Sequence, residues 1–450
     1  MSDEKNVTPE EAHVESLTPL WFRRATVTAG VLALIAGVPA AIALFCLVPL
    51  ILGNDSSSET IMFGVVSLTV ALLTLGAGGL AFFHGNRSVQ NKPSKPLRFL
   101  LSPWLLFGTF IFLLIVGGVI GLAHNSIALL FPPIFVACAS LPPLWAVTWM
   151  IPRTTANDEP SKPPFLTWRR GLLSFAGGAT VSVFIAIVLE ILLPVIVLSL
   201  VFNLAGTLSD QVSDLFRALS NREIADALTN RSFIYIFVQI ALIAPLAEEL
   251  AKPLITLPLI KNANKKEAFW IGAIAGAGFA TLENIIYATG GFSIWAGILL
   301  VRALGGALHP LGAGLMAQGW HGVLRGEKDA GKNWWKRFGI AVAVHAAWNG
   351  GSLLVITLGG ARFFGDLPAE IDLLGLSAAG TTLAFLLILG ITALWIGRSY
   401  GHDKPILVTE GEIASENEFV PSDRAVALWA VACLIALVPA GIAGLKIWLR

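Results

Sequence analysis

The chain has 450 residues and a formal net charge of +1 at pH 7. Hydrophobic residues make up 55% of it and charged residues only 13%, and its mean hydropathy is +0.75. This composition excludes an ordinary soluble globular protein. We expect a polytopic membrane protein whose surroundings are the lipid bilayer, and we expect it not to bind nucleic acid.

Apolar segments long enough to cross a bilayer follow one another along the chain. They predict an all-α protein with about eleven transmembrane helices, because each crossing needs roughly 20 mostly apolar residues. The predicted spans are 26–52, 61–83, 99–123, 127–150, 171–203, 233–260, 268–289, 293–319, 337–358, 371–397 and 425–448.

These spans fall into groups. The expected parts are a cytoplasmic tail (1–24), an N-terminal four-helix region (25–151), a cytoplasmic linker (152–170), a core (171–360) with an external loop (204–232), and a C-terminal two-helix region (361–450). Apolar residues at helical spacing in the external loop predict a short amphipathic helix there.

The loops between spans alternate between those with and those without lysine and arginine. Arg23 and Arg24 precede the first span and the loop at 84–98 is basic, whereas GNDSSSET between them has no basic residue. Short cytoplasmic loops collect these residues, so we expect a cytoplasmic N-terminus and, with an odd number of spans, an outside C-terminus. The first residues lack the apolar region of a signal peptide, so a tail is expected. The expected location is the plasma membrane.

Polar side chains gather in the consecutive spans between 233 and 358. They are Glu248, Glu249, Lys252, Glu283, Asn284, Arg302, His309, His345 and Asn349. An ionisable residue inside a span costs a few kcal/mol and usually faces the bundle interior or a wet cavity. A structural role for so large a group is therefore disfavoured, although Arg302 alone fits equally well as a structural partner of a glutamate.

The first charged group lies in the run LAEELAKP. Glu248 and Lys252 are separated by four residues, so they share a helix face and are expected to pair, whereas Glu249 points about 100° away. One carboxylate is therefore expected to remain unpaired.

Small residues accompany the polar ones on later spans. Gly272, Gly276 and Ala280 form a stripe that allows another helix to approach closely. Pro310 removes a backbone hydrogen bond beside His309 and leaves room for a ligand or water.

The depth of the polar residues in the membrane provides a further test. At about 1.5 Å per residue, Glu248, Glu283, His309 and His345 lie at similar distances from the cytoplasmic ends of their spans. Carboxylates and imidazoles at one depth are suited to hold a divalent metal with an open position, or to activate a water by a carboxylate. The spacing alone is compatible with both.

The order of these motifs resembles a known family. EELAK at 248–252, FATLEN at 279–284, the span with His309 and HAAWN at 345–349 resemble the PrsW family of intramembrane proteases, over about residues 233–358. The chain is also similar to the CAAX prenyl protease and bacteriocin-processing superfamily. The second motif of that superfamily ends in histidine where this chain has Glu283, and this departure favours PrsW.

The resemblance implies catalytic roles for three residues. Glu248 would be the general base, and Glu249 would orient the site or share its proton. Asn349, one turn beyond His345, would donate a hydrogen bond to the oxyanion of the tetrahedral intermediate.

The resemblance further implies that Glu283, His309 and His345 position a metal or the nucleophilic water. The metal implied is zinc, although a glutamate-activated water without metal also fits this superfamily. By family analogy the partner is a membrane protein substrate, such as an anti-sigma factor or another single-pass protein.

Two other functions are compatible with intramembrane carboxylates. A secondary transporter would use Glu248, Glu249 and Glu283 as a proton relay, but it should show internal repeats, and no second copy of these motifs is evident in the first half of the chain. A non-catalytic scaffold derived from a protease is disfavoured because every motif residue is present.

Overall fold

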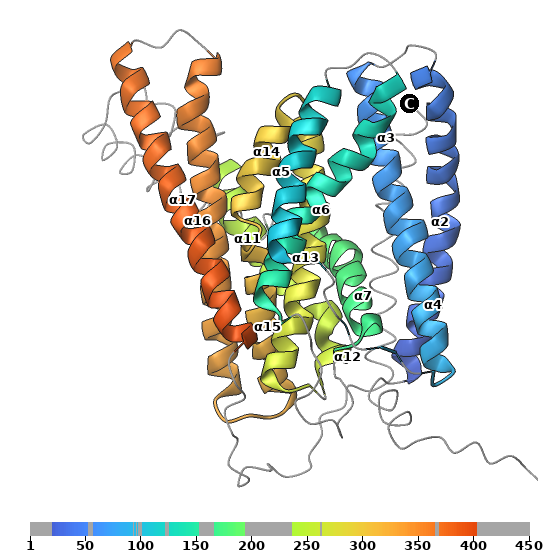
Figure 1. Cartoon of the computed structure of the whole chain (residues 1–450). Helices are drawn as coiled ribbons and strands as arrows, with labels where there is room; N and C mark the ends of the chain where they lie inside the picture. The colour runs from blue at the N-terminus through green and yellow to red at the C-terminus, as the bar shows by residue number, and fades with distance from the viewer. Residues whose placement is uncertain are drawn as a thin grey trace, which may run out of the picture.

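The chain folds into a helical bundle (Figure 1). The computed structural model describes residues 20–52, 57–92, 94–95, 97, 101–121, 126–152, 166–193, 236–261, 263–364 and 369–402. Every regular element in these ranges is a helix. Within these described ranges, eight helices are long and apolar enough to cross a membrane, or up to nine if one bent pair counts as a span. The expected all-α membrane fold is confirmed, while the expected count of about eleven is not.

The helices follow the predicted spans closely in the first half of the chain. The N-terminal elements are α2 (Leu20–Leu52), α3 (Ser58–Ala71), η1 (Leu72–Gly76), α4 (Ala77–Val89), α5 (Pro103–Ile120), η2 (Ser126–Leu130), α6 (Phe131–Met150), α7 (Trp168–Gly177) and η3 (Gly178–Ser182). A single apolar span, Trp168–Leu193, contains the last two of these.

The second half contains shorter pieces. Its elements are η4 (Gln239–Ile243), α11 (Ala244–Ala251), η5 (Leu254–Thr256), α12 (Leu257–Ile260), α13 (Lys265–Gly290), η6 (Phe292–Ile294), α14 (Trp295–Leu304), α15 (Leu308–Leu324), α16 (Ala330–Phe364) and α17 (Ala369–His402).

Two predicted spans are interrupted. The segment expected as one span at 233–260 changes from π-helix to α-helix and then to 3-10 helix, and α11 ends just before Pro253, which has no backbone N–H to continue it. The span expected at 293–319 bends by 41° between α14 and α15. The expected span at 425–448 and the amphipathic helix of 204–232 lie outside the described residues.

Helix α13 occupies the centre of the bundle (Figure 1). It packs against α6, α7 and α15, while α2 with α4 and α16 with α17 lie toward opposite sides. Most of α13 is buried. The helix that carries Glu283 is therefore held on several sides at once.

Glycines bring the neighbours of α13 unusually close. A methyl group on Gly276 would lie 2.7 Å from the carbonyl carbon of His309, and one on Gly178 would lie 2.7 Å from the carbonyl carbon of Ala275. Real side chains do not approach a backbone so closely. The predicted small-residue stripe is confirmed, and its partner is α15, the helix that carries His309.

The basic helix ends meet at one end of the bundle. Arg23 at the start of α2 donates to Asn91 just after α4, at 2.7 Å, and Arg169 at the start of α7 donates to the Lys92 carbonyl at 2.6 Å. Lys265 at the start of α13 pairs with Glu327 after α15, at 2.9 Å. This grouping agrees with the alternation of charge expected from the sequence.

Candidate active site

The polar residues of four elements meet inside the bundle. Glu248 comes from α11, Glu283 from α13, His309 from α15 and His345 from α16. Each of these residues is buried, with 6% or less of its surface exposed. The convergence expected from depth is therefore observed.

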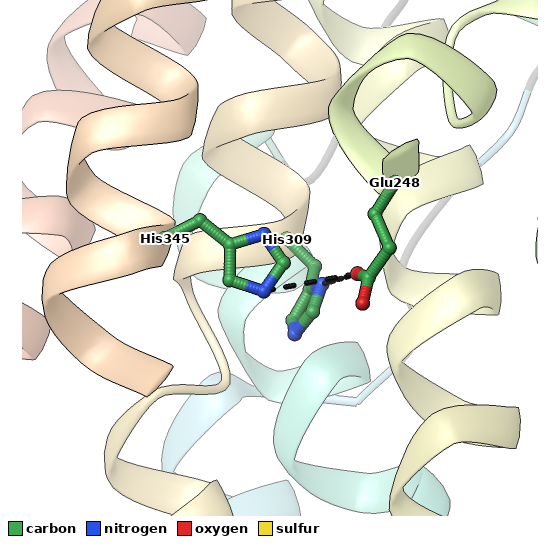
Figure 2. Close-up of side chains that lie close together, drawn as sticks. All are labelled: Glu248, His309 and His345. Carbon is green, nitrogen blue, oxygen red and sulfur yellow. Dashed lines mark ion pairs between the residues drawn. The ribbon is translucent and has the colours of Figure 1, made fainter. Parts of the chain in front are cut away.

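The centre of the group consists of Glu248, His309 and His345 (Figure 2). Glu248 Oε2 lies 3.8 Å from His309 Nδ1 and 3.7 Å from His345 Nε2. Each residue offers one ligand atom, and the three atoms all lie within 4.8 Å of one another. Neither of these two imidazole nitrogens has a hydrogen-bond partner among the described residues. Three buried donor atoms therefore surround one point.

The second nitrogen of each imidazole faces another carboxylate. His345 Nδ1 and Glu249 Oε1 are hydrogen-bonded at 2.9 Å, and His309 Nε2 lies 3.0 Å from Glu283 Oε2. These two carboxylates therefore fix the planes of the two rings. Glu283 therefore lies beside His309 Nε2, whereas Glu248 Oε2 faces His309 Nδ1 and His345 Nε2.

Lys252 has no exposed surface and contacts both neighbouring glutamates. Its Nζ lies 2.6 Å from Glu249 Oε1 and 3.0 Å from Glu248 Oε2. The expectation that Lys252 pairs with Glu248 alone and leaves the other carboxylate unpaired was wrong. Residues three apart on a helix are neighbours as much as residues four apart, and the long lysine side chain reaches both.

The aromatic ring of Phe279 joins Lys252 to His309. The ammonium group of Lys252 lies 4.6 Å from the centre of the ring, and the ring is stacked on the imidazole of His309 with 5.8 Å between centres. The sequence analysis included Phe279 only as the first residue of FATLEN and predicted no role for it. Its position three residues after Gly276, on the helix carrying Glu283, was the available signal.

Ser182 is a second residue that sequence reasoning missed. Its hydroxyl donates to the Lys252 carbonyl at 3.2 Å. That carbonyl is available because the helix does not continue regularly past Pro253. Ser182 lies in a run of small residues with no distinguishing pattern, so no sequence signal points to it.

Arg302 and Asn349 lie at the edge of this group of polar residues. Arg302 Nη2 lies 2.8 Å from Glu283 Oε2, which agrees with the ion-pair role weighed for it from the sequence. The amide of Asn349 donates to the Ile240 carbonyl in η4 at 3.1 Å. This bond ties α16 to the segment that leads into α11.

A buried group of carboxylates and imidazoles inside apolar helices is compatible with an intramembrane protease, and a comparison with family models agrees with this class. Residues 167–370 match the model of the PrsW family intramembrane metalloprotease, so this segment of the chain is similar to that family. The predicted resemblance is thereby confirmed. Comparison with curated proteins and with solved structures gave no match.

Proposed function

We propose that the protein is an endopeptidase that hydrolyses a peptide bond in or near a membrane-spanning substrate, with Glu248 as the general base. The observation that carries this proposal is the meeting of Glu248 Oε2, His309 Nδ1 and His345 Nε2 at 3.7 and 3.8 Å. A water held there would face a carboxylate that accepts its proton and later returns it to the amine leaving group.

The same three atoms are suited to a divalent metal. Ligand atoms about 2 Å from a tetrahedral zinc lie roughly 3.3 Å from one another, which is close to the separations observed. Histidines that hold a metal commonly turn their second nitrogen to a carboxylate, as His309 and His345 do here. We propose zinc, held by His309, His345 and one oxygen of Glu248; when bound it would act as a Lewis acid and activate water. The second oxygen of the Glu248 carboxylate would then be the one that accepts the proton.

This proposal changes the ligand set expected from the sequence. Glu283 lies on the far side of His309, with its Oε2 shared between His309 Nε2 and Arg302. We therefore propose that Glu283 orients the imidazole and that Glu248 takes its place beside the two histidines. Glu249 has the matching role for His345.

Asn349 remains our candidate for the oxyanion donor. One hydrogen of its amide is used by the Ile240 carbonyl, and a primary amide has a second hydrogen to donate. Its place one turn after His345 supports this role, because the two residues lie on the same face of α16.

The substrate and the location are proposed from the family. The substrate would be a membrane protein, for which a single-pass anti-sigma factor is one candidate. The protein would lie in the plasma membrane with a cytoplasmic N-terminus and an outside C-terminus, because of the distribution of basic loops.

The test compares the membrane proteome of a wild-type strain with that of a Glu248→Gln strain. The amide keeps the shape of the side chain and removes the base, so a full-length membrane protein should accumulate and its fragments should disappear. Glu59→Gln, which removes an exposed carboxylate in the first turn of α3, should leave the fragments unchanged.

Identical fragment patterns in the wild-type and Glu248→Gln strains would contradict the proposal. Proton-coupled uptake lost in the same variant would then favour the secondary transporter, since a relay also depends on intramembrane carboxylates.

A further inference from the structure

The bent span between α14 and α15 brings two side chains to one oxygen atom. Arg302 lies in the last turn of α14, and His309 lies in the first turn of α15. Both reach Glu283 Oε2 on α13, at 2.8 Å for Arg302 Nη2 and 3.0 Å for His309 Nε2. One carboxylate oxygen therefore joins the two halves of the broken span.

Arg302 is itself held from several directions. Its Nε donates to Asn284 Oδ1, and Asn284 Nδ2 in turn donates to the Ala139 carbonyl of α6 at 2.9 Å. The guanidinium lies over the ring of Tyr287, 4.5 Å from its centre. The arginine is thus fixed against both α13 and, through Asn284, α6.

We propose that Arg302 is a positioning residue that aims the Glu283 carboxylate at His309 Nε2, so that the imidazole carries its hydrogen on Nε2 and leaves the lone pair of Nδ1 for the metal or water that would lie between His309 and Glu248. This inference rests on the proposed function of the central group. The carboxylate beside Nε2 favours the tautomer with hydrogen there, since the hydrogen-bond partner of one ring nitrogen sets the role of the other.

The two histidines would consequently be opposite tautomers. His345 would give the hydrogen of Nδ1 to Glu249 Oε1 and keep a lone pair on Nε2, on the side of Glu248. His309 would keep its lone pair on Nδ1 instead. His309 Nδ1 and His345 Nε2, which are different nitrogens of the imidazole ring, then face the same oxygen, Glu248 Oε2. This difference requires a separate orienting carboxylate for each ring, and both are present.

A lysine could not replace Arg302 in this role. The guanidinium is flat and contacts Glu283 with one nitrogen, Asn284 with another and Tyr287 with its face, whereas an ammonium offers one nitrogen on a flexible stem. Arg302→Lys keeps the positive charge near Glu283 and removes the fixed aim. The variant therefore separates positioning from charge neutralisation.

A matched control lies elsewhere on the same protein. Arg337 Nη1 donates to an amide oxygen, that of Gln318, at 2.7 Å, and its guanidinium lies over the ring of Tyr400 at 5.8 Å. Like Arg302 it contacts an amide oxygen and an aromatic ring, but it belongs to the basic end of α16. Arg337→Lys tests the loss of such contacts away from the site.

The experiment measures turnover and the histidine tautomer separately in full-length protein in lipid. Arg302→Lys should lower kcat by about 10- to 100-fold, the usual effect of losing an outer partner of a ligand histidine, with KM and the thermal midpoint near wild type. Arg337→Lys should keep wild-type kcat. The tautomer is read from the ¹⁵N spectrum of histidine-labelled protein, in which the His309 signals are identified as those absent from His309→Asn. In the wild type these signals should show that Nε2 carries the hydrogen. In Arg302→Lys they should show a mixture of the two tautomers of His309.

Two results would overturn the proposal: hydrogen on Nδ1 of His309 in the wild type, or unchanged kcat in Arg302→Lys. A fall in kcat that merely follows a fall in thermal midpoint would also overturn it. If Arg302→Lys does not fold, Tyr287→Leu decides the matter, because it removes the face under the guanidinium, and a normal kcat would exclude positioning. The ¹⁵N result does not depend on proteolysis, so failure of the proposed function would be recognised separately by an inactive wild type.

Discussion

Lys252 is the residue on which the charge balance of the site depends. It is the cation closest to Glu249 and also pairs with Glu248, at 2.6 and 3.0 Å, in a place without solvent. Removing one partner of a buried ion pair leaves an uncompensated charge and costs about 3–5 kcal/mol. We expect Lys252→Met to lower the free energy of unfolding by about this amount, as measured by denaturant unfolding in detergent, and to lower activity.

The double variant Lys252→Met with Glu249→Gln serves as the control, because it removes a carboxylate together with the lysine. It should recover part of the lost stability while remaining inactive. A Lys252→Met protein as stable as wild type would show that the two ion pairs contribute nothing to folding.

The histidines allow a test of the metal. Purified wild type should contain about one zinc per chain by elemental analysis, because imidazole and carboxylate ligands favour that ion. His345→Ala removes a ligand atom, so metal content and activity should fall together, and a strong chelator should inactivate the wild type until zinc is added. Fully active protein without stoichiometric metal would exclude zinc and leave Glu248 as base unaffected.

At this scale the sequence predicts which residues meet but not which atoms touch. Depth along the spans was enough to bring Glu248, His309 and His345 together. The choice between Glu248 and Glu283 as the third donor depends on side-chain rotamers and on helix rotation, which residue spacing does not determine. The reach of Lys252 to both glutamates was missed because a helical wheel treats a flexible side chain as a fixed direction.

The contact between α13 and α15 allows a prediction about a whole helix. Gly276→Ala would place a methyl group 2.7 Å from the His309 carbonyl carbon and 2.9 Å from Ala313 Cβ, so the two helices must separate. Overpacking of this kind costs about 1–3 kcal/mol, and it would also displace His309. We expect lower thermal stability and a larger loss of proteolytic activity.

Gly290→Ala provides the comparison on the same helix, because nothing lies within 4 Å of a methyl group there. This variant should be as active and as stable as wild type. Equal effects of the two substitutions would mean that the helix responds to the loss of glycine itself and not to the contact with α15.

Hydrophobic length predicts where helices occur but does not reveal where they break. The expected spans at 127–150 and 268–289 agree well with Ile127–Met150 and Lys265–Gly290. The interruption near Pro253 was visible as a proline, yet prolines also occur inside α6, which continues through Pro142 and Pro143. Whether a proline ends a helix depends on the neighbours of the break and not on the proline alone; at Pro253, Ser182 donates to the carbonyl of the preceding Lys252.

Across the whole molecule, the basic helix ends predict the direction of insertion. Two variants, Ser57→Cys and Lys332→Cys, each carry a single cysteine in a background without the native cysteines. They should differ in how far that cysteine is labelled in intact cells. A membrane-impermeant maleimide should label position 57, which follows the first span, and should reach position 332 only after the cells are opened. Labelling of position 332 in intact cells would reverse the proposed orientation.

The gathering of basic ends followed from the sequence because the rule depends on composition and not on packing. The tilt of the helices and the central position of α13 did not follow from it. They arise from contacts such as that of Gly178 with Ala275, which join segments distant in the chain.

The end of the helix shortly after Glu248 also affects how the protein enters the membrane. Helix α11 ends at Ala251, and the residues that follow it to Ile260 form only short helical pieces, η5 and α12. The helix carries Glu248 and Glu249, and Lys252 follows it directly; each of these charged side chains costs about 3 kcal/mol when a translocon passes a lone segment into lipid. This segment is therefore a poor candidate for insertion by itself and has to partition together with neighbours that supply its partners. Biogenesis and assembly of the catalytic centre would then be a single event, so that a chain stalled before α13 emerges would hold an unfinished segment at the membrane surface.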